Sequence, residues 1–187
     1  MRKITTALLL LFCSNSFANE LDKVDITAYI QKIEELGRSD QAIRTGGFSA
    51  EQIIEVDKKN LSELKKIINE IGFPTLDLVG KEAHVASWSI VQHAVHDLDY
   101  MKYFLSELYE REDTESIIIK VIPYLHDRVS RIEGKLQKFG TQGSCSSNQY
   151  VIHEIEDPKK VGSLRKKYGL MPLDEYISES TEFLCSQ

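Results

Sequence analysis

Apolar residues recur along the first half of the chain at the three- and four-residue spacing of amphipathic helices. The pattern predicts a first helix over residues 21–36, with Gly37 as its stop. A second helix begins after Ser49, because a serine followed three residues later by Gln52 is a capping box. Its apolar face continues until Gly72, where a Phe-Pro pair prevents further helix.

Two further helices are expected before the pattern changes. Residues 81–110 contain no Gly or Pro and carry regularly spaced apolar residues, so they predict one long central helix. Residues 114–133 predict a fourth helix that Pro123 either kinks or divides, and that Gly134 closes.

The last third of the chain has a different pattern. The runs KLQKFGTQ and YVIHEI flank the loop GSCSSN, and their composition predicts a small two-stranded hairpin. Asp157 is expected to cap a short helix that has Pro158 at its first position and ends near Gly169, and Pro172 is expected to open a last helix. The predicted fold is mainly α, a single-domain helical bundle with a small C-terminal β-hairpin.

The first eighteen residues have the pattern of a cleavable secretory signal. Arg2 and Lys3 precede an apolar run over residues 7–12, and small residues at Ser16 and Ala18 mark a cleavage site. The run is shorter than the roughly 20 residues that a membrane-spanning helix needs. We therefore expect a signal peptide at residues 1–18, one helical domain over 19–187, and a periplasmic or secreted protein.

Charge limits the partners that this domain can bind. Without residues 1–18 the chain keeps 21 basic against 29 acidic residues, a net charge of −8. Nucleic acids and anionic membranes are bound through clustered Lys and Arg, so neither is expected as a partner. A small-molecule or polar ligand remains compatible with this composition, and the sequence leaves a protein partner open.

The domain has two cysteines, Cys145 and Cys185. In an oxidising compartment an even pair is a disulfide candidate, and closing this loop would stabilise the fold by about 2–4 kcal/mol. Two unpaired thiols are the alternative.

One group of polar side chains lies within the predicted long helix. Helical spacing places His93 one turn from His96 and from Asp97. A histidine beside a carboxylate in a cleft is a general acid or base near neutral pH. The alternative is a satisfied core histidine beside solvated aspartates.

A second group, His126 to Arg128, follows thirty residues later. Histidines and aspartates in this order are found in helical metal-dependent phosphohydrolases. The spacing of His93 and His96 is not the four-residue spacing that best lets two histidines share one ion. No cofactor is therefore predicted, and a divalent metal is kept as a minor alternative.

Two more polar groups suit ligand binding. Gln137, Thr141 and Gln142 form an amide- and hydroxyl-bearing turn that would hydrogen-bond a neutral ligand, unless it is simply a hairpin bend. In the other group, Arg44 follows Asp40 and Gln41, and its guanidinium would hold a carboxylate or phosphate.

The order of these motifs resembles a bacterial domain family of unknown function. The resemblance rests on DQAIR from Asp40, the WxxVQHA run from Trp88, DR at Asp127, GKLQKFGTQ from Gly134 and LRKKYGLMPL from Leu164. It covers residues 38–176. The resemblance implies no established reaction, but it singles out polar positions, and a shared polar site explains them economically because unpartnered polar groups are costly to bury.

Two functional hypotheses follow. In the first, the chain is an exported hydrolase that activates water directly, with catalytic residues His93, Asp127 and Asp40. Its substrate-binding residues would be Arg44, Gln41, Gln92, Arg128, Gln137, Thr141, Gln142 and Arg165. In the second, the chain is a non-catalytic binding or inhibitor module whose polar cluster only fixes helix packing. An open cleft shared by these side chains would favour the first, and a sealed, mutually paired network the second.

Overall fold

The computed structural model describes residues 26–185, so the predicted signal peptide lies outside the described residues. The elements in chain order are α1 (Ile26–Thr45), α2 (Ala50–Ile71), α3 (Leu76–His93), α4 (Leu98–Glu110), α5 (Val121–Ile132), β1 (Gly143–Ser146), β2 (Gln149–Ile152), α6 (Val161–Lys167), α7 (Leu173–Ser180) and a π-helical turn, η1 (Thr181–Cys185). The predicted mainly α fold with a small C-terminal hairpin is confirmed. No helix between residues 26 and 185 combines the length and the apolar character needed to span a bilayer.

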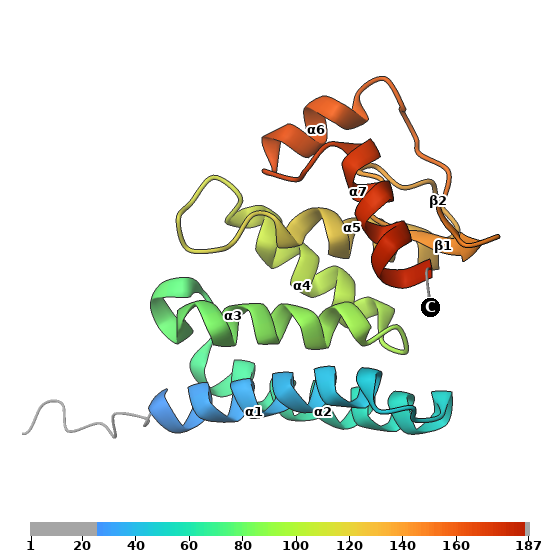
Figure 1. The fold of residues 1–187 in the computed structure, drawn as a ribbon. Helices are drawn as coiled ribbons and strands as arrows, with labels where there is room; N and C mark the ends of the chain where they lie inside the picture. The colour runs from blue at the N-terminus through green and yellow to red at the C-terminus, as the bar shows by residue number, and fades with distance from the viewer. Residues whose placement is uncertain (1–25, 186–187) are drawn as a thin grey trace, which may run out of the picture.

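The helices are stacked in layers (Figure 1). α1 and α2 lie side by side, α3 packs across them, and α4 and α5 pack on the far side of α3. The hairpin, α6 and α7 form the end of the stack beyond α5. The main core lies between these layers and includes the fully buried side chains of Ile33, Leu64, Val91, Met101, Phe104, Leu108, Ile122, Leu125 and Phe139.

The expected ends of α2 are confirmed. The Ser49 hydroxyl accepts the backbone N–H of Gln52, and the Gln52 side chain accepts the backbone N–H of Ser49. Gly72 ends the helix with φ of +87°, which favours glycine.

The expected stop at Gly37 is wrong, because α1 continues through it to Thr45. Gly37 is buried against α3, and a Cβ built on it would lie 2.6 Å from the Cβ of Ala86. The glycine therefore allows close packing of α1 on α3 and does not end the helix. This extension places Asp40, Gln41 and Arg44 on the last turns of a helix, not in a loop.

The single long helix expected over residues 81–110 is also wrong. The chain turns at residues 94–97, and Asp97 caps α4 by accepting the backbone N–H of Tyr100 at 3.1 Å. An aspartate competes well for helix N-termini, which explains the break in a stretch without Gly or Pro. His93 consequently becomes the last residue of α3.

The fourth helix begins later than expected, at Val121. Pro123 lies in the first turn, where a helix needs no backbone N–H from it, so the proline neither kinks nor divides α5. Gly134, with φ of +72°, follows the end of this helix as expected.

The hairpin is displaced from its expected strands. β1 is the GSCS segment itself, and Ser147 and Asn148, both with positive φ, form the two-residue turn into β2. Residues 135–142, expected as the first strand, run irregularly instead. The disulfide joins Cys145 to Cys185 with 5.5 Å between Cα atoms and ties η1 to β1.

The last helices are close to their expected places. Asp157 accepts the backbone N–H of Lys159 at 3.0 Å, but residues 158–160 form turns and regular α6 begins only at Val161. α7 begins directly after Pro172 as expected.

Candidate functional site

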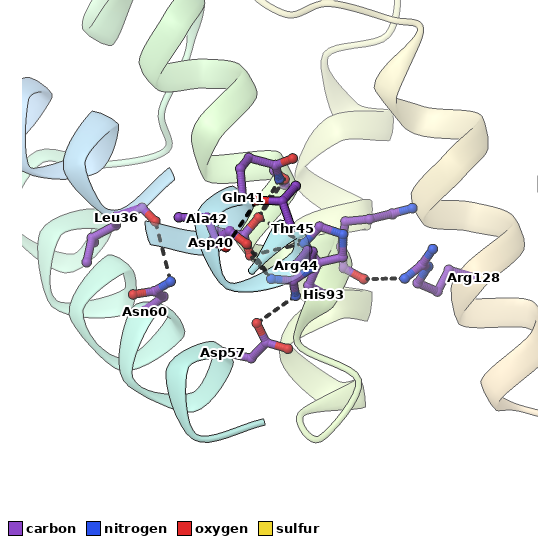
Figure 2. A network of polar contacts seen from close by, with 12 residues as sticks. Leu36, Asp40, Gln41, Ala42, Arg44, Thr45, Asp57, Asn60, His93 and Arg128 are labelled. Atoms are coloured by element: carbon purple, nitrogen blue, oxygen red, sulfur yellow. Dashed lines mark hydrogen bonds and ion pairs between the residues drawn. The ribbon is translucent and has the colours of Figure 1, made fainter. Parts of the chain in front are cut away.

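A buried aspartate and a partly exposed histidine meet where α1 packs on α3. Asp40 is 0 % exposed, and the Nδ1 atom of His93 lies 3.0 Å from both of its carboxylate oxygens. The imidazole retains 21 % of its exposure. Figure 2 shows the two side chains approaching from the two helices.

Three further side chains contact the same carboxylate. Gln41 donates through Nε2 at 2.7 Å and Ser89 through Oγ at 3.0 Å, and Arg44 forms an ion pair through Nη1 at 3.2 Å. Sequence reasoning missed Ser89, although its position four residues before His93 places it on the same face of α3. Gln41, Ser89 and Trp88 also line a groove of about 770 Å³ between α1 and α3.

Arg44 is already bonded to protein groups. Its Nη2 lies 2.6 Å from the Asp57 carboxylate on α2, and its Nη1 donates to the Asp40 backbone carbonyl at 2.5 Å. The side chain is 23 % exposed. Figure 2 shows it between the two aspartates, where it ties α2 to the end of α1.

The environment of Asp40 favours its ionised form. Burial alone would raise the pKa, but the hydrogen bond and charge of His93, with Arg44 and Ser89, bring the pKa of Asp40 below its ordinary value. An ionised carboxylate only accepts hydrogen bonds, so the proton of a neutral His93 lies on Nδ1. Nε2 has no hydrogen bond within residues 26–185, so its lone pair is free to accept a proton, as a general base requires.

Asp127 lies in a separate, sealed cluster. It is 0 % exposed and accepts the backbone N–H groups of Lys138, Phe139 and Thr141 at 2.8–3.1 Å, and the Thr141 hydroxyl at 3.0 Å. Among the described residues no hydrogen bond or ion pair joins it to His93. Its contacts shape the 138–141 turn.

Gln137 and Arg165 hold the same turn from its other sides. Gln137, 0 % exposed, donates to the carbonyls of Gln142 and His153 and accepts the N–H of Gln142. Arg165, 1 % exposed, donates to the carbonyls of Phe139, Gly140 and Met171. The Gln142 side chain donates back to Thr141. The hydrogen bonds of these four candidate ligand-binding residues thus go mainly to backbone groups; the four are Gln137, Thr141, Gln142 and Arg165.

Gln92 and Arg128 lie between the two clusters. Arg128 of α5 reaches across to α3, where its Nη1 is 3.4 Å from the Gln92 carbonyl (Figure 2). Gln92 is 4 % exposed, and its Oε1 has no hydrogen-bond partner in the part of the chain that the structure describes.

The other histidine-containing groups do not join the site. His96 is exposed in the turn after α3, and Asp97 is the cap of α4. The Nδ1 of His126 lies 2.8 Å from the Tyr109 hydroxyl, and burial lowers the pKa of His126. Within residues 26–185 no three His, Cys, Asp or Glu side chains are grouped as a metal site requires.

Comparison with known proteins identifies the family. The model of a family of unknown function, DUF6624, matches residues 23–183. The chain belongs to this family. No curated protein and no solved structure matches it. The expected resemblance to a family of unknown function is therefore confirmed. The residues that match the DUF6624 model include both polar clusters and Arg128, which lies between them.

Proposed function

We propose that the chain is an exported hydrolase that acts on a small polar or anionic substrate, with His93 as its general base. The observation that carries the proposal is the Asp40–His93 pair, in which a fully buried carboxylate orients an imidazole that is still 21 % exposed. An orienting carboxylate of this kind fixes the tautomer and stabilises the imidazolium that forms during proton transfer.

In the proposed reaction, Nε2 of His93 takes a proton from water as the water attacks the electrophilic atom of the substrate. The resulting imidazolium then gives that proton to the leaving group, and the Asp40 carboxylate stabilises the positive charge between the two steps. No covalent intermediate is required.

The remaining candidate residues take different roles. Gln41 lines the groove between α1 and α3 and donates to Asp40, so we assign it to substrate contact beside the pair. Arg44 is a positioning residue, since Asp40 and Asp57 already hold its guanidinium. We assign Asp127, Gln137, Thr141, Gln142 and Arg165 to building the 138–141 turn. Export is supported by the pattern of residues 1–18 alone.

The alternative is a non-catalytic binding or inhibitor module. It is supported by the saturation of Asp40, whose carboxylate is in contact with four side-chain donors, as expected of a structural network. It predicts that removing His93 unfolds the protein without abolishing any reaction.

The proposal is tested on the mature chain, residues 19–187, with chromogenic carboxylic esters, phosphate esters, glycosides and peptide anilides. His93→Ala is compared with His96→Ala. His96 lies three residues after His93, is exposed, and among the described residues forms no hydrogen bond or ion pair with Asp40 or Asp127. We expect turnover of at least one class by the wild type and by His96→Ala, and a loss of at least 100-fold in kcat/KM for a folded His93→Ala.

Two results would contradict the proposal. One is equal turnover by His93→Ala and the wild type. The other is no turnover of any class together with an unfolded His93→Ala, which would favour the binding-module alternative.

A further inference from the structure

The contact between α3 and α5 contains buried polar atoms that no described residue satisfies. Trp88 and Gln92 lie four residues apart on α3, and Tyr124 and Arg128 lie four residues apart on α5. We call these four residues the α3–α5 seam. The Trp88 and Tyr124 rings meet at 6.1 Å between centroids, and Arg128 bonds to the Gln92 carbonyl, so the two pairs follow one another along the contact.

Three atoms of the seam are buried without a hydrogen-bond partner in residues 26–185: Nε1 of Trp88, Oε1 of Gln92 and Nε of Arg128. Buried polar groups are nearly always paired, because leaving one unpaired costs about 1–3 kcal/mol. Two of the three are donors and one is an acceptor.

The charge of Arg128 is also uncompensated. It forms no ion pair within the described residues, and its only hydrogen bond is the long one through Nη1. Burial and the Arg44 guanidinium lower the pKa of Arg128, while the phenol groups of Tyr150 and Tyr176 oppose that shift. Asp40 and Asp57 already offset the charge of Arg44, so the guanidinium in this region without a described carboxylate partner is that of Arg128.

Arg165 shows why the free edge of Arg128 is unusual. Arg165 also has no carboxylate partner among the described residues, but three backbone carbonyls occupy its Nε and Nη1 and only Nη2 is left unpaired. In Arg128 the edge formed by Nε and Nη2 has no hydrogen bond to any described residue. That edge presents two parallel N–H groups, the geometry that binds a carboxylate or phosphate through two oxygens.

We propose that the α3–α5 seam binds a small organic oxyanion, a carboxylate or a phosphate ester, through the Nε–Nη2 edge of Arg128. Gln92 Oε1 accepts a hydrogen bond from an N–H or O–H group on the same ligand, and the Trp88 and Tyr124 rings contact its apolar part. His93 directly follows Gln92, so a ligand held here lies beside the proposed base. Only the identification of this ligand as the substrate rests on the proposed function.

Trp88 makes the binding measurable without an enzymatic assay. It is the only tryptophan of the chain, so intrinsic fluorescence reports on the seam. The probes are N-acetylphenylalanine for the carboxylate class and phenyl phosphate for the phosphate class, with N-acetylphenylalanine amide as the uncharged control. The proteins are the wild type, Arg128→Gln and the matched control Arg131→Gln, whose arginine is exposed on the same helix.

We expect one acidic probe to change the Trp88 emission saturably in the wild type and in Arg131→Gln. In a folded Arg128→Gln, we expect its affinity to fall at least tenfold, because two charge-assisted hydrogen bonds are lost. Which acid binds distinguishes carboxylate from phosphate recognition. If Arg128→Gln does not fold, it is replaced by Arg128→Lys, which keeps the positive charge but cannot form the bidentate hydrogen bonds of a guanidinium.

Three results would overturn the inference: equal binding of acid and amide, unchanged affinity in Arg128→Gln, or no emission change with either acid up to about 10 mM. Binding that persists in His93→Ala, without turnover by the wild type, would support the seam and reject the hydrolase. Turnover whose KM is unchanged in Arg128→Gln would support the hydrolase and reject the seam as its substrate site.

Discussion

Two aspartates of this chain are both 0 % exposed, yet their partners differ in kind. Asp127 is held by three backbone N–H groups and one hydroxyl from a single turn. Asp40 is held by four side chains, one of which is a partly exposed imidazole. A carboxylate bonded to backbone can only shape the chain, whereas one bonded to a titratable side chain can also control a proton. Burial alone therefore does not separate structural from chemical aspartates.

The largest effect is expected at Asp127. In Asp127→Asn the new amide NH₂ would face backbone donors, so several buried N–H groups would lose their acceptor. We expect the free energy of unfolding to fall by about 3 kcal/mol or more, which lowers the melting temperature by roughly 6–12 °C. Thermal denaturation followed by circular dichroism measures this. The exposed Asp99→Asn is the control, and an equally small shift in both variants would refute a structural role for Asp127.

The disulfide should stabilise the same end of the molecule. Cys145→Ser with Cys185→Ser should lower the free energy of unfolding by about 2–4 kcal/mol. Hydrogen exchange should show faster exchange in the hairpin and η1, with α1 to α3 unchanged. Uniformly faster exchange would show instead that the two ends of the molecule unfold together.

Asp40→Asn should have a smaller effect that depends on pH. The pKa of Asp40 is lower in the folded than in the unfolded protein, where it is about 4. Ionised Asp40 therefore stabilises the fold above about pH 4, and this stabilisation is lost as the pH falls through the folded pKa. The difference between the urea midpoints of the wild type and Asp40→Asn should therefore decrease as the pH is lowered from about 5 to about 3. A gap that stays constant over this range would contradict the pKa direction.

His93→Ala should change stability least. The imidazole is partly solvated, and Gln41, Ser89 and Arg44 still satisfy Asp40 without it. We expect a loss of about 1 kcal/mol, seen as a shift of a few degrees in melting temperature. A loss as large as that of Asp127→Asn would place both aspartates in the structural class.

The sequence predicted the helical class, the capping box of α2 and the pairing of Cys145 with Cys185, because each depends on local spacing or on a small number of candidates. Helix boundaries failed where another part of the molecule decides them. Gly37 is typical of a helix end, but its contact with Ala86 is visible only once α1 and α3 are packed. The break at Asp97 required an N-cap to prevail in a stretch whose apolar spacing alone favours helix.

For the candidate site, sequence reasoning found the polar residues but grouped them incorrectly. Asp127 was expected to assist His93, yet its partners are backbone N–H groups, which every residue has and no motif reveals. Ser89 could have been found from its spacing to His93. The contact of Asp40 with His93 spans 53 positions in the chain and depends on helix packing, so spacing could not predict it.

The close approach at Gly37 makes the Asp40–His93 pair sensitive to a residue that belongs to neither partner. Gly37 lies one turn before Asp40, and its missing side chain sets how near α1 comes to α3. A methyl group at position 37 would push α1 away from α3 and lengthen the 3.0 Å contact between His93 Nδ1 and the Asp40 carboxylate, while every polar group of the site is kept. Position 37 is thus a spacer by which the strength of the pair can be adjusted without altering its chemistry.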